Sequence, residues 1–331
     1  AERIPSPSIE QLAQDYPGLQ VVVVDDGSSD RTPAILSELQ GRYANLTVVR
    51  GKEPGQGWLG KPHAMRQGLE RAAGELVLLA DADVRYAPGT HRKAAAELVR
   101  DGLDMLVLLP RHEGPWAAQL VVLHLDAFFL FGMPSFLYNV PRFKLVAMGA
   151  GAGNLLSRKA LDAVGGMEAL RGEVVEDVAL GRKVKALRGR LRVVKAFGEV
   201  RVRMYGSLRQ ALEGFTKNLY GFLGYSPWRV GLAMLAGAVY HLVPLGTLAA
   251  FPAAPRGLLV PAAIAVSLEL LLEAATCLWS RHPLWLAALF PMRLALWWYL
   301  ILRSAWRYHR RGIVWRGRAY GKRQGRGAGE P

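Results

Sequence analysis

Three long apolar runs in the last third of the chain constrain its fold more than any other feature. They are Val230–Phe251, Gly257–Trp279 and Leu284–Trp306. Each approaches or exceeds the roughly 20 residues that a helix needs to cross a bilayer. Because three such runs in succession are hard to bury as helices of a soluble domain, we predict that residues 229–306 form a membrane region of about three apolar helices.

Two glutamates and one arginine interrupt these runs. Glu269 and Glu273 are four residues apart and therefore share one face of a helix. Ionisable side chains at that depth face protein or water rather than lipid. We expect these glutamates to pair with Arg293 of the third run; a direct role in binding a substrate is the alternative.

Much of the positive charge follows the last run. The formal net charge is +15, and residues 307–331 form a basic tail with no acid before Glu330. Such a tail beside a span stays cytoplasmic. Three full crossings would put it opposite the N-terminal part, so we expect one run to be re-entrant or interfacial. A nucleic-acid-binding protein would instead carry this charge on a soluble face, so no nucleic-acid partner is expected.

Composition excludes two further classes. With 51% hydrophobic residues, the 331-residue chain is not largely disordered. Its single cysteine, Cys277, excludes an internal disulfide framework and a multi-thiolate zinc site.

Residues 1–228 alternate short aliphatic runs with helical patterns. The predicted strands are Gln20–Val24, Leu46–Arg50, Glu75–Ala80 and Met105–Leu109; the predicted helices are Pro33–Tyr43, Lys61–Ala73 and Thr90–Arg100. This order predicts an α/β fold, a mostly parallel sheet flanked by helices, with ligands at the carboxyl ends of the strands. We expect the apolar segment Ala117–Val140 to lie on a membrane; the alternative is a core helix of this domain.

Acidic residues follow two of the predicted strands. The first strand runs into Asp25 and Asp26, adjacent carboxylates suited to hydrogen bonding a ribose or base; a turn without a ligand is the alternative. The third strand runs into Asp81 and Asp83, spaced i, i+2. Oxygen ligands of this kind suit a magnesium ion that shares its site with substrate phosphates.

Two later segments also carry chemistry. Glu176 and Asp177 begin a predicted helix, where a carboxylate can either be stabilised by the helix dipole or serve as a general base. Gly149–Asn154 is rich in glycine but does not open the first β-α unit, so it is not read as a dinucleotide-binding loop. We expect a glycine-lined wall that lets a sugar approach the backbone.

In their order and spacing, these motifs resemble the inverting family-2 glycosyltransferases with the GT-A fold. The matching residues are Asp25-Asp26-Gly-Ser-Ser-Asp-Arg-Thr, Gly60-Lys61, Asp81-Ala-Asp83, Gly153-Asn154 with Arg158 and Gly165-Gly166, and Glu176-Asp177. They extend over about residues 15–200. The remainder is similar to membrane-bound members associated with carotenoid or hopanoid glycosylation.

The resemblance implies a donor site for a nucleotide-diphosphate sugar, with a UDP-sugar as first choice. Asp25 and Asp26 would hold the uracil and ribose, and Lys61 would lie near the nucleotide or its diphosphate. Gly153 and Asn154 would line the donor site.

The resemblance also implies a metal and a base. Asp83 would ligate Mg²⁺ or Mn²⁺ on the diphosphate, with Asp81 beside it on the ribose or sugar. Asp177 would be the general base and Glu176 would support it. A single displacement would then invert the anomeric centre, with the metal neutralising charge on the leaving group.

Two departures from the family matter. The family begins with an apolar strand ending near Ala-Arg-Asn-Glu, whereas this chain begins Ala1-Glu2-Arg3-Ile4. We expect an N-terminally truncated catalytic domain with a gap in the sheet beside the donor site, which puts the activity of this chain in question. The Gln-x-x-Arg-Trp motif of processive synthases is absent from the sequence, which favours transfer of a single sugar.

The sequence therefore predicts a multi-pass cell-membrane enzyme with a cytoplasmic catalytic domain. It would glycosylate a hydroxyl of a lipid or isoprenoid partner. The alternatives are transfer to a polyprenyl phosphate, or a non-catalytic membrane scaffold that keeps the fold. The sequence fixes neither the sugar, the acceptor nor the oligomeric state.

Overall fold

A computed structural model describes residues 7–132, 135–140, 147–311, 313–315 and 318–320 of the chain. The chain divides into two compact units. The α/β unit comprises residues 1–113 and 133–204, and the helical unit comprises residues 114–132 and 205–331. The helical unit therefore begins earlier than the expected boundary at residue 228 and takes one segment from inside the predicted catalytic domain.

The α/β unit holds three groups of hydrogen-bonded strands among its described residues, in the orders β1-β2, β3-β7-β5-β8 and β4-β9-β6. The strands are β1 Val21–Asp25, β2 Leu46–Arg50, β3 Leu76–Leu79, β4 Val84–Tyr86, β5 Met105–Leu109, β6 Arg111–His112, β7 Asn154–Ser157, β8 Leu191–Lys195 and β9 Val200–Val202. Within the described residues, β1 pairs only with β2, and β3 only with β7. β1 and β3 therefore belong to separate groups of paired strands.

The described strands of the α/β unit pair in both directions. β1 and β2 run parallel, as do β5 and β8 and also β6 and β9, whereas β7 runs antiparallel to both β3 and β5, and β4 runs antiparallel to β9. The predicted α/β fold is confirmed, and the antiparallel pairs of β7 and β4 depart from the mostly parallel pairing that was expected. The chain passes through the helical unit before it returns to form β7, so β7 is not part of a β-α-β repeat.

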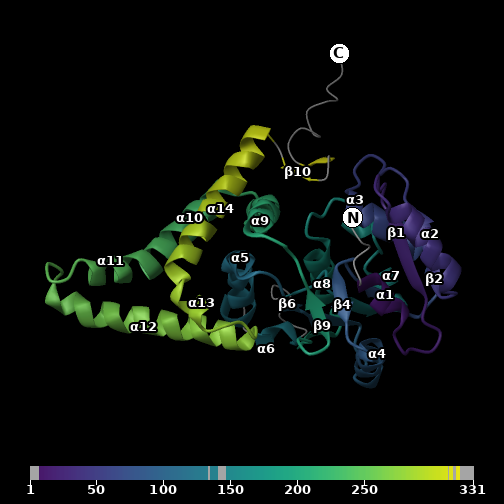
Figure 1. Cartoon of the computed structure of the whole chain (residues 1–331), viewed down its shortest axis with the longest axis horizontal. Coiled ribbons are helices and arrows are strands. Elements are labelled where there is room, and N and C mark those ends of the chain that lie inside the picture. Colours follow the sequence, from purple (N-terminus) through teal and green to yellow (C-terminus); the bar gives the residue numbers. More distant parts are fainter. Residues whose placement is uncertain (1–6, 133–134, 141–146, 312, 316–317, 321–331) are drawn as a thin grey trace, which may run out of the picture. The chain divides into compact units, whose positions relative to one another are not determined.

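Helices accompany the strands of the α/β unit (Figure 1). They are α1 Pro7–Leu12, α2 Thr32–Arg42, α3 Gly60–Leu69, α4 Thr90–Arg100, α6 Ser135–Tyr138, α7 Arg158–Ala163, the 3₁₀ turn Glu168–Leu170 and α8 Glu176–Ala186. Pro33 stands in the first turn of α2, where its missing N–H costs nothing. The side chain of Ser157 caps α7 by accepting a hydrogen bond from Ala160 N at 3.1 Å.

The core of the α/β unit lies between the sheets and α4. Its fully buried members include Val84, Leu106 and Val200, and Leu98 is the contribution of α4. The five residues of β5 are all buried, which explains why its sequence is uniformly apolar.

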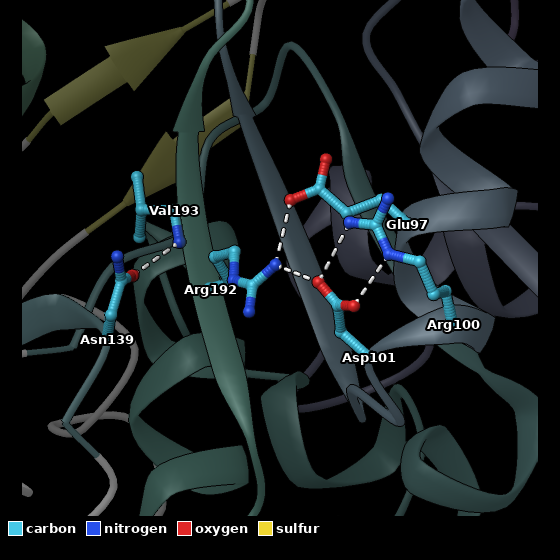
Figure 2. Close-up of polar contacts among 6 residues, drawn as sticks. All are labelled: Glu97, Arg100, Asp101, Asn139, Arg192 and Val193. Atoms are coloured by element: carbon cyan, nitrogen blue, oxygen red, sulfur yellow. Dashed lines mark hydrogen bonds and ion pairs between the residues drawn. The ribbon is translucent and has the colours of Figure 1, made fainter.

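Polar contacts at the edge strand β8 fix its place (Figure 2). Arg192 forms ion pairs with Glu97 at 3.1 Å and with Asp101, which also pairs with Arg100 at 2.8 Å. One residue along the strand, the N–H of Val193 donates to Asn139 Oδ1 at 2.9 Å. These contacts join β8 to the end of α4 and to the residues after α6.

The helical unit is built around three helices, α5 Trp116–Ala127, α9 Leu208–Phe222 and α14 Phe290–Arg311. Most of α5 is buried, including every residue from Ala118 to Leu123. The prediction that Ala117–Val140 lies on a membrane is therefore wrong for the part that forms α5, because neighbouring helices cover it. It is a core helix, although of the helical unit rather than of the α/β unit.

The remaining elements of the helical unit are α10 Pro227–Gly237, the π turn Ala238–Leu242, α11 Val243–Ala249, α12 Arg256–Trp279, α13 Trp285–Ala288 and the hairpin β10 Ile313–Trp315 with β11 Arg318–Tyr320; the π turn Phe128–Gly132 follows α5. Together, α10, its π turn and α11 form one helix of 23 residues, and α12 has 24. Both are long and apolar enough to cross a membrane.

The third predicted apolar helix differs from these two. The run Leu284–Trp306 forms the short α13 and most of α14, and neither has the length and hydropathy of a span. Within it, Arg293 is fully buried and pairs with Glu273, as expected, while Glu269 contacts His241 instead.

Candidate active site

One lysine draws three segments of the α/β unit together. Lys61 lies in the first turn of α3, and its Nζ is 2.6 Å from Asp81 Oδ1 and 2.5 Å from Glu176 Oε1. Asp81 follows β3 and Glu176 begins α8. Asp81 and Glu176, which are 95 positions apart in sequence, therefore share one cation.

A lysine is poorly placed at this end of a helix, because the helix dipole there is positive. Burial by itself lowers the pKa of Lys61, but the carboxylates of Glu176, Asp81 and Asp177 outweigh it and raise that pKa. The ammonium ion is thus held in place by acids rather than by its own helix. Lys61 lies among acids in the structure, and its expected position near the nucleotide or its diphosphate stays a prediction.

Asp177 lies next to this cluster, and the charges around it act on its pKa in opposite directions. Burial and the neighbouring Glu176 carboxylate raise its pKa to about 7, although Lys61 and a hydrogen bond from Val178 N act in the opposite direction. That hydrogen bond, to Asp177 Oδ1, measures 2.7 Å. A carboxylate with such a pKa can take up a proton near neutral pH, as a general base must.

Glu176 resolves one alternative from the sequence. A solvent-exposed acid at a helix start needs no function, but Glu176 is buried and bound to Lys61. Burying an acid is unfavourable unless a partner stabilises its charge. The first turn of α8 therefore does more than complement the helix dipole.

The glycine-rich segment packs against these acids. A Cβ on Gly149 would lie 1.9 Å from the backbone oxygen of Asp177, and one on Gly151 would lie 2.4 Å from Asp81 Oδ2. The N–H of Asp81 donates to Gly151 O at 2.8 Å. Gly149 and Gly151 are needed because a side chain there would displace α8 or Asp81. That the segment also lets a sugar approach the backbone stays a prediction.

Two predicted residues of this wall face away from the cluster. Asn154 is buried, and its Oδ1 accepts a hydrogen bond from Ala150 N at 2.9 Å. A Cβ on Gly153 would meet Leu108 and the hydroxyl of Tyr86. These contacts close the loop from inside, so a direct role of either residue in donor binding stays a prediction.

Tyr86 is a supporting residue that the sequence analysis missed. It lies in β4, just after the Asp81–Asp83 turn, and its hydroxyl donates to Ala152 O at 2.5 Å. Its ring also packs edge-on against His91, with ring centroids 4.9 Å apart. In the sequence, the position of Tyr86 three residues after Asp83 is the one feature that could have identified it.

Asp83 is the predicted metal ligand. Among the described residues, no group of three His, Cys, Asp or Glu side chains could hold a metal ion. Asp83 is exposed, whereas Asp81 is bound to Lys61. Because Mg²⁺ often uses one or two carboxylates together with substrate phosphates, Asp83 fits such an ion if a diphosphate supplies further ligands.

Asp25 and Asp26 end β1, as predicted. Asp25 Oδ1 accepts a hydrogen bond from Ser28 N at 3.0 Å, which shapes the turn into α2, and Gly51 N donates to Asp25 O at 2.9 Å. Asp26 is exposed beside this turn. The turn and the two acids are present, and their contact with a nucleotide stays a prediction.

His63, in the first turns of α3, is buried and has a hydrogen-bond partner. Its Nδ1 is 3.0 Å from Gln67 Nε2, and its ring packs against Trp58. Gln67 in turn accepts a hydrogen bond from Lys52 N at 2.8 Å. The histidine therefore supports the loop before α3.

Residues 8–165 match the model described as "Glycosyl transferase family 2". A beta-monoglucosyldiacylglycerol synthase of Synechocystis sp. is 32% identical over 170 residues, covering 48% of this chain and 33% of the relative. The chain thus spans about a third of the length of this relative.

Two other relatives are similar over different lengths. A 4,4'-diaponeurosporenoate glycosyltransferase of Staphylococcus haemolyticus is 23% identical over 222 residues, covering 64% of this chain and 56% of the relative. A dolichol-phosphate mannosyltransferase of Pyrococcus furiosus is 32% identical over 88 residues, covering 27% of this chain and 23% of the relative.

Proposed function

Because residues 8–165 are a family-2 glycosyltransferase domain, we propose that this chain transfers one sugar from a nucleotide-diphosphate sugar to a lipid hydroxyl, with inversion. The observation that carries the proposal is the position of Asp177 beside the Lys61–Glu176 pair. Inverting transfer needs one base that takes the acceptor proton while the leaving group departs from the opposite face of the sugar.

Asp177 has the features required of that base. Its raised pKa makes it a stronger base than an exposed aspartate, and Lys61 forms an ion pair with its neighbour Glu176. In the proposed reaction, the acceptor oxygen attacks the anomeric carbon, its proton passes to Asp177, and the nucleoside diphosphate leaves with the electrons of the broken C–O bond.

The donor would lie at the carboxyl ends of β1 and β3. Asp25 and Asp26 would hold the base and ribose of a UDP-sugar, and Asp83 would hold Mg²⁺ or Mn²⁺ on its diphosphate. Such an ion would neutralise charge on the leaving group. Gly151 would let the sugar approach the backbone beside Asp81.

A lipid acceptor is supported by two observations. The Synechocystis relative is named for a glucosyldiacylglycerol product. In this chain, two helices long and apolar enough to span a membrane follow the family-2 domain. A membrane location with the α/β unit in the cytoplasm follows from the same proposal.

The test uses the purified full chain in lipid vesicles. It would be incubated with UDP-glucose, UDP-galactose or UDP-N-acetylglucosamine and Mn²⁺, together with diacylglycerol or a water-soluble alcohol. We expect a glycolipid of inverted configuration, identified by NMR, and a loss of about 10²–10⁴-fold in rate for Asp177→Asn. Asp15→Asn is the matched control, because Asp15 is an exposed acid paired with Arg92.

Other outcomes would replace the proposal. Glycosylation of the water-soluble acceptor alone would refute a lipid acceptor. Transfer to a polyprenyl phosphate with only a mild effect of Asp177→Asn would favour that acceptor, since a phosphate needs no strong base; the dolichol-phosphate mannosyltransferase similarity is what supports this second candidate. If the chain neither bound UDP nor turned over a nucleotide-sugar, the result would favour the non-catalytic membrane scaffold.

A further inference from the structure

The last long helix, α14, has two unlike faces. The inward face is buried and packs in the core of the helical unit; its members are Arg293, Leu294, Leu300, Ile301 and Ser304. The outward face is a stripe of exposed residues at helical spacing, namely Met292, Ala295, Tyr299, Leu302 and Trp306. We call this set the α14 stripe. The guanidinium of Arg303 lies over the ring of one member, Tyr299, 5.8 Å from its centroid.

Contacts on the inward side hold α14 firmly to α9. Arg303 and Arg307 both pair with Glu213, and Ser304 Oγ accepts a hydrogen bond from Tyr220 N at 2.9 Å. The orientation of the stripe is therefore fixed by the helical unit. It faces outward because α9 and α5 occupy the other side.

The two span-length helices point in a different direction. α11 packs against α12, so that α10, α11 and α12 form a long hairpin. In Figure 1 this hairpin extends to one side, and α14 lies near its open end. Both α10, where the hairpin begins, and α13, which follows its end, contact α14.

Exposed tryptophans mark the open end of the hairpin. Trp228 stands at the start of α10 and Trp285 begins α13, a few residues after α12 ends. Trp285 packs edge-on against Trp116, with ring centroids 5.8 Å apart. Tryptophan is enriched where a helix passes from hydrocarbon to headgroups, so both ends of the hairpin lie at one interface.

The apolar length of α14 is also short for a crossing. From Phe290 to Arg303 the helix rises about 20 Å, whereas the hydrocarbon core of a bilayer is about 30 Å thick. Arginines recur from Arg303 to its end. Amphipathic helices of this kind lie at the headgroup boundary with the apolar face inward.

We propose that α14 lies in the plane of the membrane, with the α14 stripe inserted at the headgroup–acyl boundary, while the hairpin of α10–α11 and α12 makes the only two crossings among the described helices. Two crossings return the chain to its starting side. The basic tail after residue 311 would then lie on the same side of the membrane as the α/β unit. Three crossings would have put it on the opposite side.

The test measures depth in the bilayer and needs neither donor nor acceptor, so its outcome is independent of the proposed function. Single cysteines carrying a spin label would replace Met292, Tyr299 and Trp306 in the full chain, reconstituted in phosphatidylcholine–phosphatidylglycerol vesicles. Relaxation by oxygen and by a water-soluble nickel chelate gives the depth of each label. Wild-type protein treated with the label is the control, because the single native cysteine, Cys277, is buried and should not react. If Cys277 does react, the single cysteines are introduced into the Cys277→Ala variant instead.

We expect the three α14 labels to lie at one shallow depth. Labels at Leu258 and Leu271, both exposed on α12, are the internal reference and should differ in position along the membrane normal by up to about 20 Å, because α12 crosses the bilayer. If α14 crossed the membrane, the labels at residues 292 and 306 would instead be separated by up to about 21 Å along the membrane normal, with residue 299 deepest.

Two further results would also overturn the proposal. Full access of all three labels to the nickel chelate would place the stripe in water. Shielding from both relaxants, together with elution as a dimer, would assign the stripe to a second copy of the chain. Each cysteine variant must elute like wild type before its depth is compared, since the replaced side chains are exposed and should not affect folding.

Discussion

Lys61 Nζ lies 2.5 Å from Glu176 Oε1, and this contact links the proposed donor side of the site to its proposed base. The same nitrogen contacts Asp81, two residues before Asp83, while Glu176 directly precedes Asp177. One ammonium group therefore fixes the position of the Asp81–Asp83 turn relative to the first turn of α8. Of the two adjacent acids, Glu176 contacts this ammonium group directly, whereas burial and the charge of Glu176 raise the pKa of Asp177 to about 7.

Transferase activity should rise with pH across neutrality. Asp177 must be deprotonated to accept a proton, and burial together with Glu176 raises its pKa to about 7. The rate should therefore be low below that pKa and reach a plateau above it. A profile of kcat/KM against pH tests this; a flat profile between pH 5 and 8 would show that Asp177 is not the base.

Opposite charge changes around Asp177 should move that profile in opposite directions. Lys61→Met removes the positive charge that lowers the pKa of Asp177, so the rise should shift to higher pH by about one unit. Glu176→Gln removes the negative charge that raises it, so the rise should shift to lower pH by a similar amount. Lys93→Met, at an exposed lysine paired with Glu199, should leave the profile unchanged. Shifts in the same direction for both site variants would contradict this charge balance.

Adding one methyl group to the glycine wall should disturb the site. Gly149→Ala places a Cβ against the backbone of Asp177, and we expect a loss of about 1–3 kcal/mol in the free energy of unfolding. Gly41→Ala in α2 is the same substitution with no atom within 4 Å, and it should stabilise the chain by about 0.5–1 kcal/mol. Thermal unfolding of both variants measures the contrast, and equal effects would argue against the close packing.

Tyr86→Phe should weaken donor binding more than folding. The variant keeps the ring but loses the hydrogen bond to Ala152 O, which costs about 0.5–1.5 kcal/mol. Because Ala152 lies next to Gly151 in the wall, we expect KM for the nucleotide-sugar to rise with kcat little changed. Steady-state kinetics with varied donor would separate the two, and an unchanged KM would exclude a positioning role for the hydroxyl.

The buried pair Arg293–Glu273 should behave as a unit. Arg293→Met leaves Glu273 without its cation in an apolar surrounding, and loss of one partner of a buried pair costs about 3–5 kcal/mol. Adding Glu273→Gln to that variant should recover much of the loss, because no charge then remains unpaired. Thermal unfolding of the two single variants and the double variant in detergent checks this, and additive losses would contradict it.

Elements of the fold that depend on neighbouring residues in sequence could be predicted, and those that depend on distant residues could not. The expected strands Leu46–Arg50 and Met105–Leu109 and the helix Thr90–Arg100 match β2, β5 and α4 in their bounds, because periodicity and burial of the chain itself determine them. The reversed direction of β7 could not be read in this way. It depends on which edge of β5 remains open after the chain returns from α5, and that is a tertiary property.

The sequence indicated which residues lie at the candidate site, but not which of them contact one another. An acid next to an apolar strand is costly to bury unless a partner stabilises its charge. The sequence analysis therefore singled out three acids, Asp81, Glu176 and Asp177. That Lys61 would join Asp81 to Glu176 depends on how α3 and α8 are placed by the sheet, which no local pattern contains. Tyr86 went unnoticed for the same reason, since its partner, Ala152, is 66 residues away.

The burial of α5 has a consequence for how the protein is made. This helix leaves the ribosome before α9 and long before the end of α14, yet those helices help to cover its apolar side chains. At about 5–20 residues per second, synthesis from the end of α5 to the end of α14 takes roughly ten to forty seconds. During that interval α5 needs another apolar shelter, from a chaperone or the insertion machinery. A chain terminated after Met204 would retain α5 without α9 and α14, and should be recovered as an aggregate or bound to chaperones.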